Sequence, residues 1–459
     1  MMKMRVLILN PPSEQKFSRD GRCQSEENTW LDTFPPTTLA SIAGAVREKH
    51  ETKLLDCIGG NINFNECMRA AKEFSPDFTV VNTSTPTIAN DMKVAKTLKE
   101  KTGSKIITYG EHVTARYKHM LKAHKFLDYL ILGEPETPTM NILSGRPKCK
   151  GVAFKGWDGG IWQEPEMDKL PFPAYDLLPE YTFPLTGEKW TFVRSGRGCF
   201  ANCLYCVMPL MSGRKVRYHS PEYMIRQFKW LIEMGIKVWM FWDEIATADR
   251  KRMEKICELM VKEGLNRKCK WFCTTRVDRF DYELAKKMRE AGCRMVSFGV
   301  ESGNQDVLDF NRKGITLEQT RKAVKAARDN RLKTIGHLIL GLPGSDEKVL
   351  EQTARFAREL KLNFAQFYVA TPFPGSDFYT LAKKKKWFIS KDWSKVEQGS
   401  VTISYPNLSN RKIEYWRRKA YRDFYMRPYA VYSLLSMMSA KQLLKLPLYF
   451  FRFRSWMKK

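Results

Sequence analysis

The sequence predicts an α/β protein made of two consecutive units, followed by a helical C-terminal region. Short apolar runs alternate with amphipathic segments over residues 4–145, which is typical of strands and helices taking turns along the chain. The same alternation resumes at Trp190 and ends near residue 390, after which basic and aromatic residues are mixed without strand signals. We therefore expect a first unit at 1–145, a linker at 146–189, a second unit at 190–390 and a C-terminal region at 391–459.

Length and composition limit the classes of protein that this chain can represent. A chain of 459 residues is long enough for two or three domains, and its apolar and charged fractions are those of a globular protein. The formal net charge of +28 is unusual and favours an anionic partner, such as nucleic acid, anionic lipid or a phosphorylated substrate. Because no run of about eighteen apolar residues occurs, we expect no membrane span.

The first unit is predicted to be a doubly wound, Rossmann-like parallel sheet. Strands are expected at 4–10, 52–57, 78–87, 105–110 and 127–134, and helices at 37–49, 65–74, 92–103 and 117–124. Ligands of such sheets bind at the carboxyl ends of the strands. The polar and glycine residues at those ends are Asn10, Thr83, Ser84, Thr85, Tyr109, Gly110, His112, Gly133 and Glu134. A dinucleotide site has little support, because no GxGxxG follows the first strand.

The linker and the second unit continue the chain with different signals. The linker contains GVAFKGWDGGIW, which predicts a β-hairpin, and then a proline-rich stretch that excludes a regular element. Strands of the second unit are expected at 190–198, 237–244, 270–276, 294–302, 333–344 and 364–375, with helices between them. Residues at the carboxyl ends of these strands that could contact a ligand are Asp243, Glu244, Arg276, Glu301, Ser302 and Gly341.

Three cysteines in the stretch GRGCFANCLYC are the strongest chemical signal in the chain. Cys199, Cys203 and Cys206 are spaced closely enough for one loop to wrap around an iron–sulfur cluster. A [4Fe–4S] cluster normally takes four thiolates, so three ligands would leave one iron open. Structural zinc sites usually have four protein ligands, and no paired CxxC follows Cys206. A disulfide framework is not expected either, because the eleven cysteines are scattered and no signal peptide precedes them.

This cysteine spacing, with Tyr205 directly before the third cysteine, resembles the radical S-adenosylmethionine (SAM) enzymes. The resemblance implies a partial (β/α)6 TIM-type barrel for the second unit and an open iron that chelates SAM. Reduction then releases a 5′-deoxyadenosyl radical that abstracts hydrogen from carbon. The resemblance also implies that SAM is bound by Tyr205, Asp243, Glu244, Arg276, Glu301, Ser302 and Gly341. Each of these residues, taken singly, could instead be a helix cap or an ion-pair partner.

The first unit and the linker resemble the cobalamin-binding subclass of these enzymes, in the branch of the anaerobic magnesium-protoporphyrin cyclase and the hopanoid-modifying enzymes. The resemblance rests on the hydroxyl cluster NTST, on GEHVTA and on the linker sequence LPFPAYDLL. It implies that the strand-end residues of the first unit contact cobalamin. The DxHxxG motif that supplies a histidine to cobalt is absent, and His112 is in the wrong place for that ligand. His112 could equally be a loop histidine bonded to the backbone, and a degenerate unit without cobalamin is the alternative.

The resemblance implies a cobalamin-dependent radical SAM enzyme, and we expect it to C-methylate an unactivated carbon of a hydrophobic, lipid-like or isoprenoid-like substrate. Radical cyclisation, ring rearrangement or carbon–carbon coupling without methyl transfer is the alternative reaction. A non-catalytic cobalamin or iron–sulfur carrier or sensor is the alternative of another class. A flavodoxin-type or ferredoxin-type protein is the expected electron donor.

The C-terminal region determines our expectation for location. Its arginines and lysines are interleaved with tyrosine, phenylalanine and leucine, which is typical of a segment in a membrane interface. The same composition also fits helices that pack on the barrel with a solvated basic face. We expect a cytoplasmic enzyme with peripheral contact to the inner face of the membrane, and we rank RNA last among the partners because no RNA-binding module accompanies the basic residues.

Overall fold

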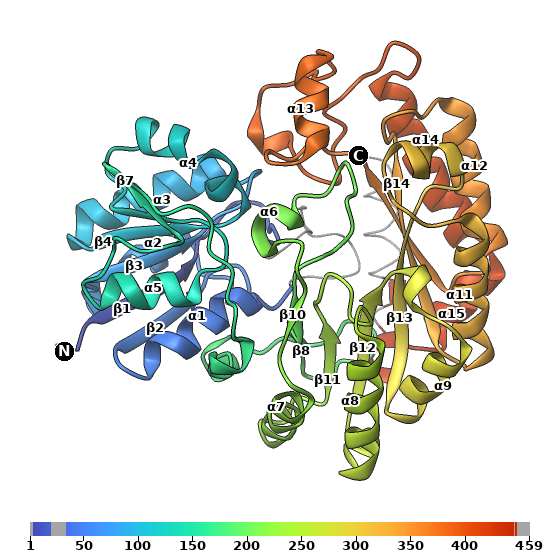
Figure 1. The fold of residues 1–459 in the computed structure, drawn as a ribbon, viewed down its shortest axis with the longest axis horizontal. Helices are drawn as coiled ribbons and strands as arrows, with labels where there is room; N and C mark the ends of the chain where they lie inside the picture. Colours follow the sequence, from blue (N-terminus) through green and yellow to red (C-terminus); the bar gives the residue numbers. More distant parts are fainter. Residues whose placement is uncertain (1–2, 20–33, 445, 448–459) are drawn as a thin grey trace.

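The computed structural model describes residues 3–19, 34–444 and 446–447, which form two α/β units side by side (Figure 1). Both units are built on parallel strands, as the alternating pattern predicts, and the fold class expected from the sequence is confirmed. Cys23 and the end of the predicted C-terminal region, residues 448–459, lie outside the described residues.

The first unit contains a seven-stranded sheet with the order β2-β1-β3-β4-β5-β6-β7. Its strands are β1 (Arg5–Asn10), β2 (Glu51–Asp56), β3 (Phe78–Asn82), β4 (Lys105–Tyr109), β5 (Tyr129–Ile131), β6 (Val152–Phe154) and β7 (Trp157–Asp158). β1 to β5 run parallel, whereas β6 and β7 form the predicted hairpin, which pairs antiparallel with β5 and extends this sheet. The strand order reverses between β1 and β3, and such a switch point is where open α/β sheets bind ligands.

Helices cover both faces of the first sheet. α1 (Thr37–Arg47) and α5 (Glu136–Leu143) cover one face, and α2 (Phe64–Phe74), α3 (Ile88–Thr102) and α4 (Glu111–Ala123) cover the other. Every residue of β3 is buried, which explains its continuous apolar sequence. The α2 helix begins at a capping box, in which Asn63 accepts from the Glu66 backbone N–H and the Glu66 carboxylate accepts from that of Asn63.

The second unit contains a six-stranded parallel sheet with the order β15-β14-β13-β12-β11-β8. Its strands are β8 (Trp190–Val193), β11 (Val238–Phe241), β12 (Lys270–Thr275), β13 (Cys293–Glu301), β14 (Lys333–Leu340) and β15 (Phe364–Val369). Each predicted strand of this unit is present, and the sheet curls into the predicted partial barrel (Figure 1). The short strands β9 (Gly196–Arg197) and β10 (Arg217–Tyr218) form a separate antiparallel pair.

Helices of the second unit lie outside the curved sheet, and the C-terminal helices close one side. The outer helices are α7 (Pro221–Glu233), α8 (Arg250–Lys262), α9 (Tyr282–Glu290), α11 (Leu317–Asp329) and α12 (Glu347–Glu359). Loops carry α6 (Met208–Ser212), α10 (Gln305–Phe310) and α13 (Asp377–Lys384), and the chain continues with α14 (Asn410–Tyr425), α15 (Pro428–Leu435) and α16 (Ala440–Leu443). Single 3-10 turns are η1 (Met167–Lys169), η2 (Tyr175–Leu177), η3 (Leu265–Arg267), η4 (Val277–Arg279) and η5 (Trp393–Lys395). α14 packs on β15 and α12. Within the described ranges, no helix is both long and apolar enough to cross a bilayer.

Buried charges join the two units. Arg217 donates to both carboxylate oxygens of Glu134 at 2.6 and 3.0 Å, and Arg197 donates to both oxygens of Glu136 at 2.6 and 3.0 Å. Arg197 and Arg217 belong to the second unit, whereas the two glutamates follow β5 of the first. Burial alone would raise the pKa of Glu136, but the guanidinium of Arg197 holds that pKa below its usual value. The pairs therefore lock the strand-end loops of the first unit against the chain that flanks the cysteines.

Candidate active site

The cysteine loop follows β8 and is held by backbone contacts to distant segments. The Cys199 N–H donates to the Gly213 carbonyl at 3.0 Å, and the Leu204 N–H donates to the Asn311 carbonyl at 3.0 Å. Gly198 has φ +103°, and a Cβ there would clash with the Lys215 carbonyl oxygen, so only glycine fits at this turn. The loop is thus shaped by the fold before any cofactor binds.

The three cysteines line one cavity of about 340 Å³ in the lumen of the barrel, together with Tyr205. Burial raises the pKa of Cys199, so a cation at this place is needed to hold its thiolate. Within residues 3–19, 34–444 and 446–447, no three His, Cys, Asp or Glu side chains converge closely enough for a single metal ion. A four-iron cluster binds each thiolate through a different iron, so its ligands stand farther apart than those of one ion. The three cysteines line the same cavity, as ligands of one cluster must.

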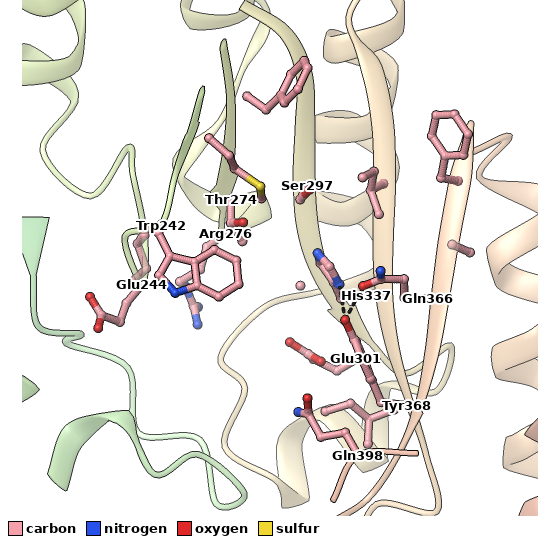
Figure 2. A pocket seen from close by; sticks show the side chains of 18 of the residues that line it. Trp242, Glu244, Thr274, Arg276, Ser297, Glu301, His337, Gln366, Tyr368 and Gln398 are labelled. Carbon is pink, nitrogen blue, oxygen red and sulfur yellow. Dashed lines mark hydrogen bonds between the residues drawn. The ribbon is translucent and has the colours of Figure 1, made fainter. Parts of the chain in front are cut away.

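Charged side chains from three strand ends surround the cysteines. Glu244, Arg276 and Glu301, all expected from the sequence, line the same cavity. Arg276 donates to the carbonyls of Lys313 and Gly314 at 2.9 and 3.0 Å, which orients its guanidinium. The Tyr205 hydroxyl is buried beside the cysteines, and burial raises its pKa well above the usual value. Glu244, Arg276 and Glu301, labelled in Figure 2, form a charged rim in the cavity that the cysteines also line.

Lys313 is a residue of this rim that the sequence did not suggest. Its ammonium donates to Glu301 at 2.6 Å, and both side chains are at least nine-tenths buried. A Cβ on Gly299 would lie 2.6 Å from the Glu301 carboxylate and 2.7 Å from the Lys313 nitrogen, so a larger residue there would displace the pair. Glu301 itself has φ +61°, a strained conformation for a residue other than glycine. Lys313 follows α10 in the sequence FNRKG, where no strand end marks it.

Three of the expected SAM residues have other contacts and do not line this cavity. Asp243 accepts from the Ser195 backbone N–H at 2.7 Å and from the Ser195 hydroxyl at 2.5 Å. The Ser302 hydroxyl contacts that of Thr353, and the Gly341 carbonyl accepts from the Tyr405 hydroxyl at 2.7 Å. Their role in binding SAM stays a prediction, while the structure shows them bracing the strand ends.

A second polar group in the cavity was also missed from the sequence. His337, Gln366 and Tyr368 project from β14 and β15 toward one another (Figure 2). The Tyr368 hydroxyl donates to the Gln366 side-chain oxygen and lies 3.3 Å from Nδ1 of His337. The sequence signal is a single histidine in IGHLIL and the alternate positions of Gln366 and Tyr368 in AQFYV, both within otherwise apolar strands.

The residues expected to contact cobalamin gather at the carboxyl ends of the first sheet. Tyr109, Gly110, Gly133 and Glu134 line a small cavity between the two units. Asn10 donates to Asp56 at 2.7 Å, the Thr83 hydroxyl donates to the Tyr109 carbonyl at 2.7 Å, and Ser84 contacts Thr87 at 2.8 Å. Thr85 is buried in the same loop. His112 is buried against Trp393, and burial lowers the pKa of His112 to about 3.

The small cavity has hydrogen-bond donors that suit cobalamin, but its volume is too small for this cofactor. Asn82 Nδ2, Arg194 Nε and Arg197 Nε belong to residues that line it, and they are buried donors without a hydrogen-bond partner in the described part of the chain. Such donors suit the acceptor groups at the edge of a large cofactor. The volume is only about 40 Å³, whereas ligand pockets usually have about 300–1,000 Å³. A corrin needs more space than this cavity offers in the structure.

Comparison with known proteins identifies the chemistry of the cysteine loop. Residues 193–357, which contain the three cysteines, match the radical SAM superfamily. A protein of Pyrococcus horikoshii named as an uncharacterized methyltransferase is 31% identical over 442 residues, which are 93% of this chain and 94% of that protein. The chain belongs to the radical SAM superfamily. The anaerobic magnesium-protoporphyrin IX monomethyl ester cyclase of Cereibacter sphaeroides is 25% identical over 418 residues, or 86% of this chain and 68% of the cyclase.

Solved structures share the two-unit fold of this radical SAM protein. The radical SAM methyltransferase TsrM of Kitasatospora setae, with cobalamin and a [4Fe–4S] cluster bound, superposes with a TM-score of 0.68 at 14% identity. That match covers 96% of this chain and 90% of TsrM. The cobalamin-dependent radical SAM enzyme OxsB superposes with a TM-score of 0.73 at 14% identity, covering 99% of this chain and 71% of OxsB. The order of a doubly wound unit before a radical SAM barrel is therefore the same in all three proteins.

Proposed function

We propose that this protein is a radical SAM methyltransferase that holds a [4Fe–4S] cluster, SAM and cobalamin and methylates an unactivated carbon of a hydrophobic substrate. The observation that supports it most is the convergence of Cys199, Cys203 and Cys206 on one cavity with the charged rim. When bound, the cluster and SAM supply a carbon-centred radical, and cobalamin supplies the methyl group. The methyltransferase relative and the fold shared with TsrM and OxsB support this reaction over the alternatives.

The chain's own residues would hold and orient these groups. The three cysteines bind three irons, and Tyr205 closes the space beside them. Glu244 and Glu301 carry carboxylates suited to an amino group or to ribose hydroxyls, and Arg276 and Lys313 carry cations suited to a carboxylate. The apolar side chains that line much of the lumen exclude water, which protects a reactive carbon radical from side reactions.

Radical cyclisation is the second candidate, and the cyclase of Cereibacter sphaeroides supports it. Products distinguish the two reactions in anaerobic assays with reductant, SAM, added cobalamin and candidate lipid extracts. 5′-Deoxyadenosine together with S-adenosylhomocysteine indicates methyl transfer, and 5′-deoxyadenosine alone indicates cyclisation or rearrangement. SAM that stays intact while the cluster is present would support a carrier or sensor and contradict the proposed enzyme.

The cluster assignment has its own test. Cys203→Ala is expected to abolish the broad iron–sulfur absorbance and to lower the iron content, because the cluster loses one of three protein ligands. Cys149→Ala is the matched control, since Cys149 is half-buried and does not line the cavity. An unchanged spectrum in Cys203→Ala would refute the ligand assignment.

We also propose a cytoplasmic location with peripheral contact to the inner face of the membrane. The proposed electron donor is a flavodoxin-type or ferredoxin-type protein. Tyr432 and Leu444 of the C-terminal helices are 67% and 83% exposed in a region rich in lysine and arginine, which supports contact with anionic lipid. Replacing both with glutamate should reduce sedimentation with phosphatidylglycerol vesicles. Unchanged sedimentation would remove this support.

A further inference from the structure

The lumen of the barrel has an apolar half, which is followed along the barrel axis by a row of polar side chains. Side chains of a strand alternate, so residues two apart face the same side. Near the amino ends of the strands, the residues that line the cavity are Phe272, Met295, Ile335 and Phe364. Two residues farther along the same four strands, the lining residues are Thr274, Ser297, His337 and Gln366. The first row is entirely apolar and the second is entirely polar.

Segments distant in sequence complete the apolar half. Trp190, Phe183 and Leu185 line it from the chain around β8, Phe34 from the segment before α1 and Leu434 from α15. Phe34 stacks on Phe192, with ring centroids 5.4 Å apart, and Phe183 packs on Phe272, with ring centroids 5.2 Å apart. We call this apolar half the hydrocarbon chamber, defined by Phe183, Leu185, Trp190, Phe272, Met295, Ile335, Phe364 and Leu434.

The chamber lies apart from the cysteines. Phe272 and Arg276 are four residues apart on one strand and its end, which corresponds to about 13 Å along the strand. Arg276 belongs to the charged rim, so the chamber is too deep in the barrel to be part of the SAM-binding end. The second row, which we call the polar row (Thr274, Ser297, His337 and Gln366), separates the two.

We propose that the hydrocarbon chamber is a binding subsite for a linear acyl or prenyl chain, and that the polar row hydrogen-bonds the oxygen-bearing group to which this chain is attached. The side chains of His337 and Gln366 offer donors and acceptors to such a group. The four strands present no polar side chain to the chamber. A polar group placed there would lose its hydrogen bonds to water and find no replacement. The proposal rests on the proposed function in one respect, which is that the reacting carbon lies beyond the polar row. Binding of the hydrocarbon chain does not depend on any reaction.

Tryptophan quenching tests the chamber directly, because Trp190 lines it. The probes are 8-bromooctanoic, 10-bromodecanoic and 12-bromododecanoic acid, titrated into full-length protein reconstituted with its cluster under anaerobic conditions. Binding should strengthen by up to about fourfold per added methylene, because each buried methylene contributes a constant increment. The saturable quenching should weaken in Trp190→Phe, and 2-bromododecanoic acid should quench less than the 12-bromo isomer.

Variants that fill the chamber distinguish binding inside it from binding elsewhere on the protein. Ile335→Phe and Leu185→Phe each add volume at half-buried positions that face the cavity, and each should weaken 12-bromododecanoic acid binding by at least tenfold. Val261→Phe is the control, because Val261 is 46% exposed on α8, outside the barrel. Thermal unfolding and iron content show that each variant is folded and keeps its cluster. A dissociation constant equal to that of the wild type in both filled variants, or quenching that does not saturate, would overturn the proposal. Failure of the proposed function is read separately, from SAM cleavage and iron content.

Discussion

The buried charges between the two units predict a large loss of stability when one of them is removed. Arg217 donates to Glu134, to the Glu164 carbonyl at 2.6 Å and to the Ser212 carbonyl at 2.6 Å. Its side chain is 8% exposed and that of Glu134 is 5% exposed, so water cannot replace the lost bonds. In Arg217→Ala, the remaining ion-pair partner of Glu134 is Arg197, at 3.3 Å. The carbonyls of Glu164 and Ser212 lose the hydrogen bonds that Arg217 donates.

Removing one partner of a buried, hydrogen-bonded ion pair costs about 3–5 kcal/mol. The loss should therefore move the urea midpoint of the second unit by on the order of 1 M, followed by tryptophan fluorescence. Iron content should fall as well, because Ser212 ends the short helix that follows the cysteine loop. Arg250→Ala is the control, since its pair with Asp281 is about half exposed and such pairs contribute at most about 1 kcal/mol.

A double variant identifies the cause of this loss. Arg217→Leu combined with Glu134→Leu removes the unpaired charge and leaves Arg197 paired with Glu136. We expect it to be more stable than Arg217→Ala, because the penalty arises mainly from a buried carboxylate that loses both bonds to Arg217 and keeps only Arg197 at 3.3 Å. A double variant no more stable than the single one would show that packing, and not charge burial, controls this interface.

Two further perturbations have defined outcomes. Gly198→Ala should lower iron content several-fold, because alanine at φ +103° would press on the Lys215 carbonyl, whereas Gly235→Ala, with φ +79° and open space around it, should leave iron content near that of the wild type. Equal iron content in both would refute the geometric account of the cysteine loop. His112 has a folded pKa of about 3, below its ordinary 6.5, so the unfolded chain binds more protons between these values and stability falls as the pH drops below 6.5. The loss from this group is about 1 kcal/mol at pH 5.5, and His112→Phe should flatten the pH dependence of unfolding. A slope unchanged in His112→Phe would contradict the burial of a neutral imidazole.

Most strands of both sheets could be predicted, because their signals are local. Continuous apolar runs such as FTVVN predict strands buried on both faces, and amphipathic segments such as FNECMRAAKEF predict helices with one buried face. The hairpin after residue 150 was also predicted, but not its place at the edge of the first sheet, since strand pairing depends on contacts distant in sequence.

The candidate site was predicted only in part, for the same reason. The cysteines are close together in the chain, so their spacing alone identified them, and Glu244, Arg276 and Glu301 were found because they lie at or near the carboxyl ends of strands. Lys313 follows a helix, and nothing in the sequence places it beside Glu301. Asp243 and Ser302 have the same local signal as the residues that line the cavity, but their side chains turn to Ser195 and Thr353.

The sequence by itself determined the order of the two α/β units, the cysteine loop and the resemblance to radical SAM enzymes. These features depend on residue type and on spacing over short distances. The tertiary structure alone decided which polar side chains share a cavity, that an apolar row lies below a polar row, and that four charges are buried between the units. Curvature of the sheet and packing of the two units set these arrangements, because they bring together side chains that are far apart along the chain.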